Sequence, residues 1–221
     1  MPKYSLLKDV PYLPETVVII DVFRSSNTII ELLHKGAERV IPVMSVGEAV
    51  KLKNTHPNWI VLGERRGEKI IGFDGDNSPT QNLDHIREAT IVLTTSGGTR
   101  CIEACKEGRD VVVGSFANVT AVINKLRDKG KLIVGFWAVG SSGEELAEED
   151  ELCADYFLAG WNGDELDYSK IVNQAKQGVG AQRLRELSQC QDLTFCLQKD
   201  IRTEVPRLQL GLDQIWSFTL C

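Results

Sequence analysis

The sequence predicts a three-layer α/β/α fold built on a mainly parallel sheet. Short apolar runs rich in β-branched residues alternate with segments of helical periodicity along the 221 residues. The runs VVII, IVL, VVV and LIV are apolar on both faces, which is typical of strands that helices cover on both sides. No linker-like or low-complexity stretch breaks this alternation, so residues 1–221 are predicted to form a single α/β domain.

Each element follows from a local pattern. The predicted strands are the β-branched runs that end at turns, at residues 17–22, 39–43, 59–63, 91–95, 111–115 and 132–138. The predicted helices lie between them, at residues 26–35, 47–54, 98–107, 119–128 and about 145–159. The tail at residues 207–221 ends in apolar residues. We expect it either to complete the sheet or to meet a partner subunit, which makes a homodimer a possible assembly.

Two segments of the chain follow the same plan. Residues 17–50 and 91–123 each run from an apolar strand through a polar loop, a helix and a glycine to a second strand and helix. Any two βαβα units share this order, so the chain has either two related halves or two units of one common type. In both cases the polar loops at residues 21–28 and 94–99 follow the C-terminal ends of strands, where open α/β sheets bind their ligands.

Composition narrows the class of protein. With a net charge of −6, the chain lacks the basic surface that nucleic-acid binding needs. No apolar run approaches the ~20 residues that span a bilayer, and the first residues lack a signal-peptide core. The six cysteines include no CxxC pair and the three histidines lie far apart, which argues against a zinc finger and favours buried cysteines in a reducing compartment. We therefore expect a cytoplasmic protein with no nucleic-acid and no membrane partner.

The stretch DVFRSSNT directly follows the first predicted strand. Arg24 precedes the predicted helix, and Ser25 and Ser26 are residues that favour a helix N-terminus. In one interpretation this is a capped helix in which Asp21 and Arg24 form an ion pair. In the other, the helix N-terminus and Arg24 bind a phosphate. Asp21 would repel that phosphate unless a cation lies between them, so the second interpretation implies Mg²⁺.

The stretch TTSGGTR follows the fourth predicted strand in the same way. Gly97 and Gly98 allow backbone N–H groups to approach a ligand closely, and the polar side chains of Thr95, Thr99 and Arg100 surround them. The stretch is not a P-loop, because the pattern GxxxxGK[ST] is absent, so ATP is not implied. Two anion-binding loops at strand ends support a phosphate site better than either loop does alone.

Three further stretches carry candidate residues. LGERRG places Glu64 and Arg65 just past another strand end. GFDGDNSP contains Asn77 and Ser78, although such a loop is also typical of a turn held by Asx hydrogen bonds. EELAEEDEL is acidic, and most such runs are solvated helix faces. If part of this run faces inward, Glu149 and Asp150 would complete a Mg²⁺ shell.

Several phosphatase classes are excluded by what the chain lacks. A haloacid-dehalogenase-type enzyme needs a second Asp where Phe23 stands, and the motifs GDxHG, GNHE and RHG are absent. Cys196 and Arg202 match the pattern C-x₅-R. The intervening LQKDI has no glycine and carries Asp200, which would repel a phosphate. We therefore predict that Cys196 is a core residue.

Taken in order, the motifs resemble those of the 2-phosphosulfolactate phosphatase family. They are DVFRSSNT, LGERRG, GFDGDNSP, TTSGGTR, GSFANVTAV and EED, and the stretch at residues 180–206 is similar to the family's C-terminal region. The resemblance covers about residues 17–206. The chain departs from the family's pattern at two positions, with Gly97 in place of Asn and Asp76 in place of Gly, and both changes alter the polar groups of the expected pocket.

The resemblance implies a Mg²⁺-dependent phosphatase that converts 2-phosphosulfolactate, or a closely related phospho-hydroxy acid, to 3-sulfolactate and phosphate on the route to coenzyme M. We assign catalytic roles to Asp21, Arg24, Ser25, Glu64 and Arg65. We assign substrate or phosphate binding to Ser26, Asn77, Ser78, Thr95, Gly97, Gly98, Thr99, Arg100 and Asn118. The expected Mg²⁺ ligands are Asp21, Glu149 and Asp150.

Two roles stay open at this level. Asp21 is either a metal ligand or a nucleophile, and the absence of a second Asp at Phe23 favours the ligand. The second anion of the substrate calls for another cation, for which Arg65 and Arg100 are candidates. The alternative to an enzyme is a non-catalytic sensor of a small phosphorylated metabolite, which would need the anion-binding loops but not the carboxylates.

Overall fold

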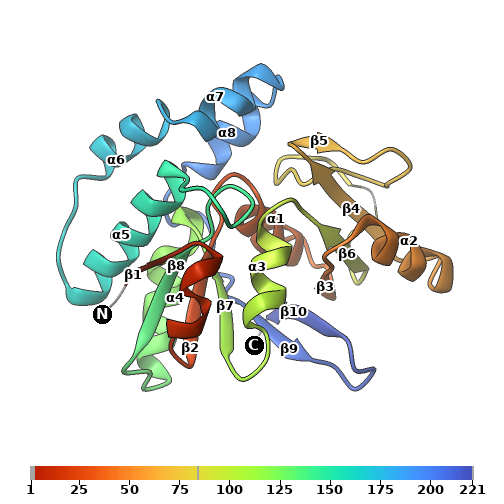
Figure 1. Ribbon diagram of the computed structural model, residues 1–221, viewed down its shortest axis with the longest axis horizontal. Coiled ribbons are helices and arrows are strands. Elements are labelled where there is room, and N and C mark those ends of the chain that lie inside the picture. The colour runs from red at the N-terminus through yellow and green to blue at the C-terminus, as the bar shows by residue number, and fades with distance from the viewer. Residues whose placement is uncertain (1–2, 84, 221) are drawn as a thin grey trace.

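A ten-stranded sheet forms the centre of the computed structural model, which describes residues 3–83 and 85–220. Within these residues the strand order is β1-β8-β2-β7-β9-β10-β3-β6-β4-β5 (Figure 1). The strands are β1 Lys3–Ser5, β2 Thr16–Ile20, β3 Arg39–Pro42, β4 Ile60–Arg65, β5 Glu68–Lys69, β6 Thr90–Thr94, β7 Asp110–Gly114, β8 Val134–Ala138, β9 Pro206–Leu210 and β10 Trp216–Leu220. The six strands predicted from apolar runs are β2, β3, β4, β6, β7 and β8, and all six are confirmed.

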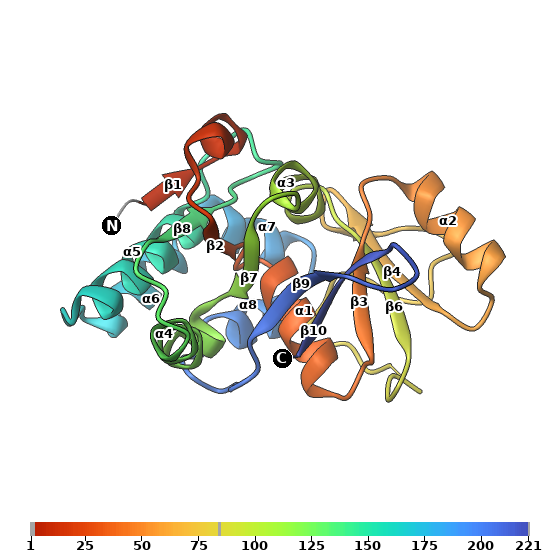
Figure 2. The same cartoon turned by 90° about the horizontal axis from the view of Figure 1, so that it is seen from below.

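Most of the sheet is parallel, as predicted, but it consists of two parallel groups. β1, β8, β2 and β7 form one group and β3, β6 and β4 the other. The hairpin of β9 and β10 joins them, pairing antiparallel with β7 on one side and with β3 on the other. Figure 2 shows the hairpin between the two groups. The C-terminal tail therefore completes the sheet at its middle, up to the last described residue.

The two groups run in opposite senses, because three successive antiparallel pairings separate β7 from β3. The alternation of strands and helices suggested that the loops after β2 and β6 lie on one edge of a single parallel sheet. This is wrong, because the two strands belong to groups of opposite sense. Five pairings lie between β2 and β6, and a twist of about 20–25° at each turns the strand direction by roughly 100–125°. This twist lets the C-terminal ends of the two strands converge instead of pointing apart.

Helices cover both faces of the sheet, which confirms the three layers. One face packs against the helices α1 and α3, with Val17, Ile19, Ile91 and Leu93 pointing toward them. The opposite face packs against α4 and α5 in the first strand group and against α2 in the second. The helices are α1 Ser25–His34, α2 Val46–Thr55, α3 Gly98–Cys105, α4 Val119–Asp128, α5 Glu148–Asn162, α6 Tyr168–Ala175, α7 Val179–Glu186 and α8 Cys190–Cys196, with short 3₁₀ turns η1 Leu7–Tyr12 and η2 Phe116–Asn118.

The five predicted helices all exist, and the one expected at about 145–159 begins three residues later, at Glu148. A bridge between Ser141 and Glu145 holds the preceding residues in a turn. The sequence patterns missed the short β1 and β5, the hairpin β9–β10, and the helices α6 to α8. These last three helices lie together along one side of the molecule (Figure 1).

The two segments with a common plan are interleaved in the sheet. The first strand of the first unit, β2, pairs with the second strand of the second unit, β7. The second strand of the first unit, β3, pairs with the first strand of the second unit, β6. The helices α1 and α3 share one face, and α2 and α4 lie on the other. This reciprocal arrangement brings the N-termini of α1 and α3 together, while a common origin of the two units stays a prediction.

Among the described residues, no helix combines the length and apolarity needed to cross a membrane. Four of the five described cysteines are buried, and Cys190 is exposed. Cys196 is fully buried and Arg202 pairs with Glu31, so their C-x₅-R spacing forms no site. Cys221 lies outside the described residues.

Candidate active site

A cavity of about 680 Å³ opens where the ends of β2, β4 and β6 meet the N-terminal part of α5 and the helix α7. Six carboxyl side chains and three arginines border it among the described residues. The carboxyl groups are Asp21, Glu64, Glu145, Glu148, Glu149 and Asp150, and the arginines are Arg24, Arg66 and Arg183. The cavity therefore carries an excess of negative charge before any ligand enters.

Asp21 stands at the end of β2, where the chain turns into α1. Its carboxylate Oδ1 accepts a hydrogen bond from the Ser25 N–H at 3.4 Å, and its backbone C=O accepts one from the Ser26 N–H at 2.9 Å. The carboxyl thus sits at the positive end of α1 and occupies the place of a capping anion. Burial, with the charges of Glu64 and Glu149, raises the pKa of the Asp21 carboxyl to about 7.

The close approach of α1 and α3 depends on Gly98. A Cβ at this position would lie 2.6 Å from Ser25 Oγ and 2.8 Å from Asp21 Oδ2. We expected Gly98 to admit a ligand, but in the structure it admits the side chains of the neighbouring loop. Its glycine is required because the two helix N-termini meet here.

Glu149 and Asp150 turn inward from the first turn of α5, as the metal-site hypothesis required. Glu149 is 5% exposed and Asp150 is 2% exposed. The Asp150 carboxylate accepts hydrogen bonds from the Val22 N–H at 2.7 Å and the Gly140 N–H at 2.9 Å. These bonds fix α5 to the end of β2, so Asp150 and Asp21 border one space. Burial and the charges of Asp21 and Glu149 raise the pKa of the Asp150 carboxyl well above its usual value.

Glu149 differs from Asp150 because one of its oxygens has no partner. Glu149 Oε2 is buried and makes no hydrogen bond to any described residue. Burial and the neighbouring Glu148 raise the pKa of the Glu149 carboxyl to about 6. Its other oxygen faces Gly180 on α7, where a Cβ would lie 2.3 Å from Oε1. An unpaired buried carboxylate oxygen is costly, so this atom is available to a proton or a cation.

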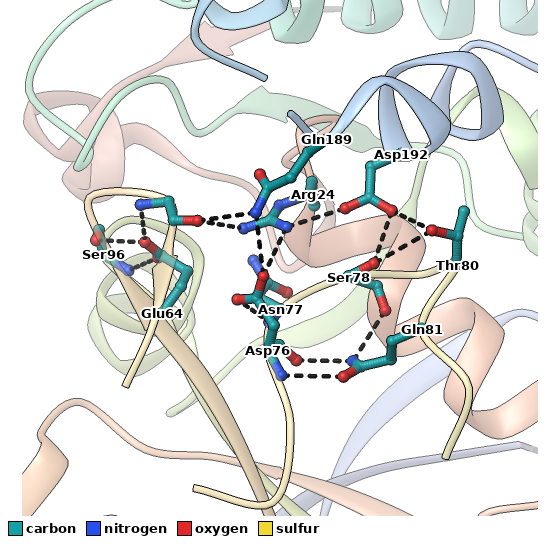
Figure 3. Close-up of polar contacts among 11 residues, drawn as sticks. Arg24, Glu64, Asp76, Asn77, Ser78, Thr80, Gln81, Ser96, Gln189 and Asp192 are labelled. Carbon is teal, nitrogen blue, oxygen red and sulfur yellow. Dashed lines mark hydrogen bonds and ion pairs between the residues drawn. The ribbon is translucent and has the colours of Figure 1, made fainter. Parts of the chain in front are cut away.

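Arg24 also borders the cavity, and it lies inside a dense set of hydrogen bonds (Figure 3). Its Nη1 donates to Asp76 Oδ2 at 3.0 Å and to Asp192 Oδ2 at 2.9 Å, and its Nη2 donates to the Gly67 C=O at 3.1 Å. Gln189 Nε2 donates to the same two acceptors, Gly67 and Asp76. Arg24 therefore joins the β4–β5 turn to α8, and it does not form the ion pair with Asp21 that a simple capped helix predicts.

Asp192 anchors this set from the first turn of α8. Besides Arg24, its carboxylate accepts hydrogen bonds from Ser78 Oγ at 2.7 Å and Thr80 Oγ1 at 2.6 Å. Asp76 is held by Gln81, whose amide accepts from the Asp76 N–H and donates to the Asp76 C=O. The extra acid noted at position 76 thus shares Arg24 with Asp192. We call Arg24, Asp76, Gln189 and Asp192 the Arg24 network.

Glu64 fixes the turn between β4 and β5. Its Oε1 accepts from the Ser96 N–H and its Oε2 from the Gly67 N–H, both at 2.6 Å, and Ser96 Oγ donates to Oε2 at 3.1 Å. The carboxylate therefore ties the TTSGGTR loop to the turn, which places both loops on the cavity wall. These bonds give Glu64 a positioning role, because both of its carboxylate oxygens hold the surrounding loops.

The predicted residues divide into two sets. Those that border the cavity are Asp21, Arg24, Glu64, Asn77, Thr95, Gly97, Glu149 and Asp150. Those that do not border it are Ser25, Ser26, Arg65, Ser78, Gly98, Thr99, Arg100 and Asn118. Arg65 donates to Thr94 Oγ1 and to the Met44 and Glu64 C=O groups, and Arg100 pairs with Glu144. Both candidate cations for a second substrate anion are therefore occupied elsewhere.

Several hydroxyl and amide groups from both sets have local structural partners. Thr95 and Thr99 cap the start of α3 with reciprocal hydrogen bonds. Asn118 Oδ1 accepts from the Ser115 N–H, and its amide donates to the C=O groups of Val113 and Glu204. Asn77 differs, because its Oδ1 is buried without a partner at the cavity wall.

Sequence reasoning missed the contribution of four residues, Arg66, Arg183, Gln189 and Asp192. Arg66 lies inside the LGERRG motif, next to Arg65, the residue of this motif that the sequence predicted for the site. The other three lie in residues 180–206, and the similarity of that stretch to the family's C-terminal region was the one available signal. Their position at the site depends on how α7 and α8 fold back over the sheet, which no local pattern reveals.

Comparison with known proteins matches this chain along most of its length. The model of a family described as 2-phosphosulpholactate phosphatase matches residues 4–211. A protein of Clostridium tetani (strain Massachusetts / E88) is 33% identical over 90% of this chain and 91% of its own length. A protein of Pseudothermotoga lettingae is 34% identical over 90% of this chain and 94% of its own length. Both relatives are named as probable 2-phosphosulfolactate phosphatases.

The match over residues 4–211, together with the acidic cavity, defines the class of protein as a phosphoric monoester hydrolase. The chain belongs to the 2-phosphosulpholactate phosphatase family. This confirms the resemblance seen in the motifs and favours the enzyme over the non-catalytic sensor.

Proposed function

We propose that this protein is a Mg²⁺-dependent phosphatase that hydrolyses the phosphate monoester of 2-phosphosulfolactate, releasing 3-sulfolactate and phosphate in coenzyme M biosynthesis. The family and the names of the relatives support the substrate. The observation that most supports the chemistry is the convergence of Asp21, Glu149 and Asp150 on one cavity, with the buried Glu149 Oε2 left without a partner.

These carboxylates fit a hard cation. In the part of the chain that is described, no three His, Cys, Asp or Glu side chains are already gathered as a metal cluster. Mg²⁺ does not require one, because it is usually held by one or two carboxylates together with waters and substrate phosphate oxygens. Glu149 Oε2 and Asp21 Oδ2 make no hydrogen bond to a described residue and are the oxygens that would hold the ion. When bound, Mg²⁺ neutralises charge on the phosphate and orients a water.

The remaining residues position the substrate. The start of α3 lies at the cavity wall with Thr95, Ser96 and Gly97, and the positive end of a helix attracts an anion. Asn77 Oδ1 is a free acceptor for a water or a protonated phosphate oxygen. Glu64 and Arg24 keep the surrounding loops in place through their own hydrogen bonds. Asp150 uses both oxygens to hold β2 and residue 140, so its part is to orient Asp21 and Glu149.

The test is phosphate release from 2-phosphosulfolactate with Mg²⁺, with EDTA, and with Mg²⁺ restored. We expect turnover that EDTA abolishes and Mg²⁺ recovers. A panel of phosphorylated hydroxy acids with and without a sulfonate, together with p-nitrophenyl phosphate, then ranks the substrate class by kcat/KM. Thermal stabilisation by these compounds without any release of phosphate would contradict the proposal and favour a sensor.

A further inference from the structure

The guanidinium groups of two arginines on the cavity wall have no partner among the described residues. Arg66 and Arg183 border the cavity, and neither guanidinium makes a hydrogen bond or ion pair to any described residue. Every other described arginine except Arg87 has such a bond, to a carboxylate, a hydroxyl or a backbone C=O. Arg87 does not border the cavity and packs beside Gly36. The two free positive charges of the site are therefore Arg66 and Arg183.

Arg66 occupies a backbone position that disfavours it. It and Gly67 form the two-residue turn between β4 and β5, since Arg65 pairs with Glu68. Both turn residues have positive φ angles, 56° for Arg66 and 83° for Gly67. Such a turn favours Asn, Asp or Gly at its first position, and a non-glycine residue there costs about 1 kcal/mol. Strain of this kind is concentrated at functional sites, and here it places a long cation beside the cavity.

Arg183 reaches the same place from α7. A Cβ on Gly67 would lie 2.5 Å from Leu187 Cδ1 and 3.6 Å from Arg183 Nε. The helix α7 therefore packs directly on the β4–β5 turn, and Gly67 is the residue that permits this contact. Arg66 and Arg183 come from distant parts of the chain but lie on the same side of the cavity.

We propose that Arg66 and Arg183 form an anion-binding subsite that recognises the acid groups of the substrate, its carboxylate and sulfonate. The proposal rests on the proposed function and extends it by naming the residues that select the substrate class. Arg24 is already neutralised by Asp76 and Asp192, and Arg65 and Arg100 are bound elsewhere. The carboxylates Asp21, Glu149 and Asp150 repel acid groups, so the phosphate lies on their side with a cation, and the acid groups lie toward Arg66 and Arg183.

Two variants remove the cations without disturbing the fold. Arg66→Asn keeps a residue that tolerates the left-handed backbone, and Arg183→Gln keeps a good helix former at an exposed position. The matched control is Arg87→Gln, which removes an exposed unpaired arginine away from the cavity. Each variant is assayed with 2-phosphosulfolactate and with p-nitrophenyl phosphate, which has no acid group besides its phosphate.

Each arginine would contribute a charge-assisted hydrogen bond to substrate binding. Removing one arginine should therefore raise KM for 2-phosphosulfolactate by about 10- to 100-fold. The value of kcat/KM for p-nitrophenyl phosphate should change by less than about threefold in the same variants. Arg87→Gln should match the parent protein on both substrates. Equal losses on both substrates, or no loss on 2-phosphosulfolactate, would overturn the subsite.

Calorimetric binding of 3-sulfolactate, with Mg²⁺ present, separates this proposal from the proposed function. If no ester is hydrolysed but 3-sulfolactate binds, and both variants weaken that binding by a similar factor, the phosphatase proposal fails while the subsite stands. If 3-sulfolactate does not bind the parent protein, or binds all three variants equally, the subsite is wrong whatever the enzyme hydrolyses.

Discussion

The two walls of the cavity use buried charge in opposite ways. On one wall, Asp21, Glu149 and Asp150 carry like charges, and none of them forms an ion pair with a described basic residue. On the other, Arg24 borders the cavity, and the rest of the Arg24 network, which does not border it, surrounds the guanidinium with two carboxylates, an amide and a backbone C=O (Figure 3). Both walls join distant segments of the chain. Among the described residues, the charges of the first wall lack a partner of opposite sign, whereas those of the Arg24 network are paired, and its one spare acceptor oxygen is the neutral Gln189 Oε1.

This difference separates reactivity from support. A buried group whose hydrogen bonds are all made within the protein has few free atoms to bind a ligand. Removing one of its partners leaves the other buried polar or charged groups unpaired. A buried group whose charge or hydrogen-bond acceptor is unpaired destabilises the protein until a proton, a cation or a substrate binds to it. The raised pKa values of Asp21, Glu149 and Asp150 indicate that the first wall is where protons or cations bind and are released. Variants of the two walls should therefore fail differently.

The largest expected effect belongs to Asp21. Asp21→Asn should lower kcat by at least about 1,000-fold, equivalent to about 4 kcal/mol of barrier. The fold should persist, since the variant removes an unpaired buried charge. Turnover is measured with Mg²⁺, and the free energy of unfolding is measured on the same preparation at pH 8 without Mg²⁺. Asp155→Asn, at a half-exposed position of α5 where the side chain pairs with Lys3, controls for the change in net charge. Near-normal turnover in Asp21→Asn would remove this residue from the chemistry.

The Arg24 network should respond through stability. Arg24→Gln leaves Asp76 and Asp192 without their cation, and breaking such a buried pair costs about 3–5 kcal/mol. The double variant Arg24→Gln/Asp192→Asn should be less unstable than the sum of its single changes, because no uncompensated Asp192 charge remains. Urea unfolding of the four proteins measures this cycle. Additive effects would show that Arg24 and Asp192 do not stabilise each other.

The pH dependence of stability tests the carboxylate wall itself. The folded-state pKa values of Asp21 and Glu149, about 7 and about 6, lie above their usual values of 3.8 and 4.5. The folded protein thus holds protons that the unfolded chain releases, and this contribution is complete below pH 4 and lost as pH rises to about 7. With EDTA, the free energy of unfolding should fall by roughly 5 kcal/mol across this window.

Mg²⁺ competes with those protons, so its addition should stabilise the protein at pH 8 and have little effect at pH 5. Asp21→Asn should flatten the fall in stability between pH 4 and pH 7. A metal-free protein that becomes more stable as pH rises through this window would contradict the shifts at Asp21 and Glu149.

The smallest effect is expected where α7 touches this wall. Gly180→Ala adds a methyl group 2.3 Å from Glu149 Oε1, which must move. Alanine improves the helix by about 1 kcal/mol, so stability should stay within about 1 kcal/mol while Mg²⁺ affinity falls about 3- to 10-fold. Gly47→Ala is the matched control, because Gly47 is also the second residue of its helix and has open space around it. Unchanged Mg²⁺ binding in Gly180→Ala would separate Glu149 from the metal.

The sequence anticipated much of the carboxylate wall. Asp21 was visible because it ends an apolar strand, and Glu149 and Asp150 because the EED motif recurs in the family. The Arg24 network was hidden for a physical reason. Arg24 and Asp192 are 168 residues apart, and nothing in the stretch around Asp192 indicates that its helix returns to the first loop.

The local order of this protein was determined by its sequence. Three patterns depend only on neighbouring residues: strand runs that are apolar on both faces, helix periodicity, and polar loops at strand ends. They were enough to predict the α/β/α layers and the main acidic residues of the site. The tertiary structure alone decided that β9 and β10 enter the middle of the sheet and reverse the sense of one strand group. It also decided which cations are free, leaving Arg66 and Arg183 at the cavity while Arg65 and Arg100 are bound. Pairing between distant residues depends on packing across the whole chain, so no local pattern records it.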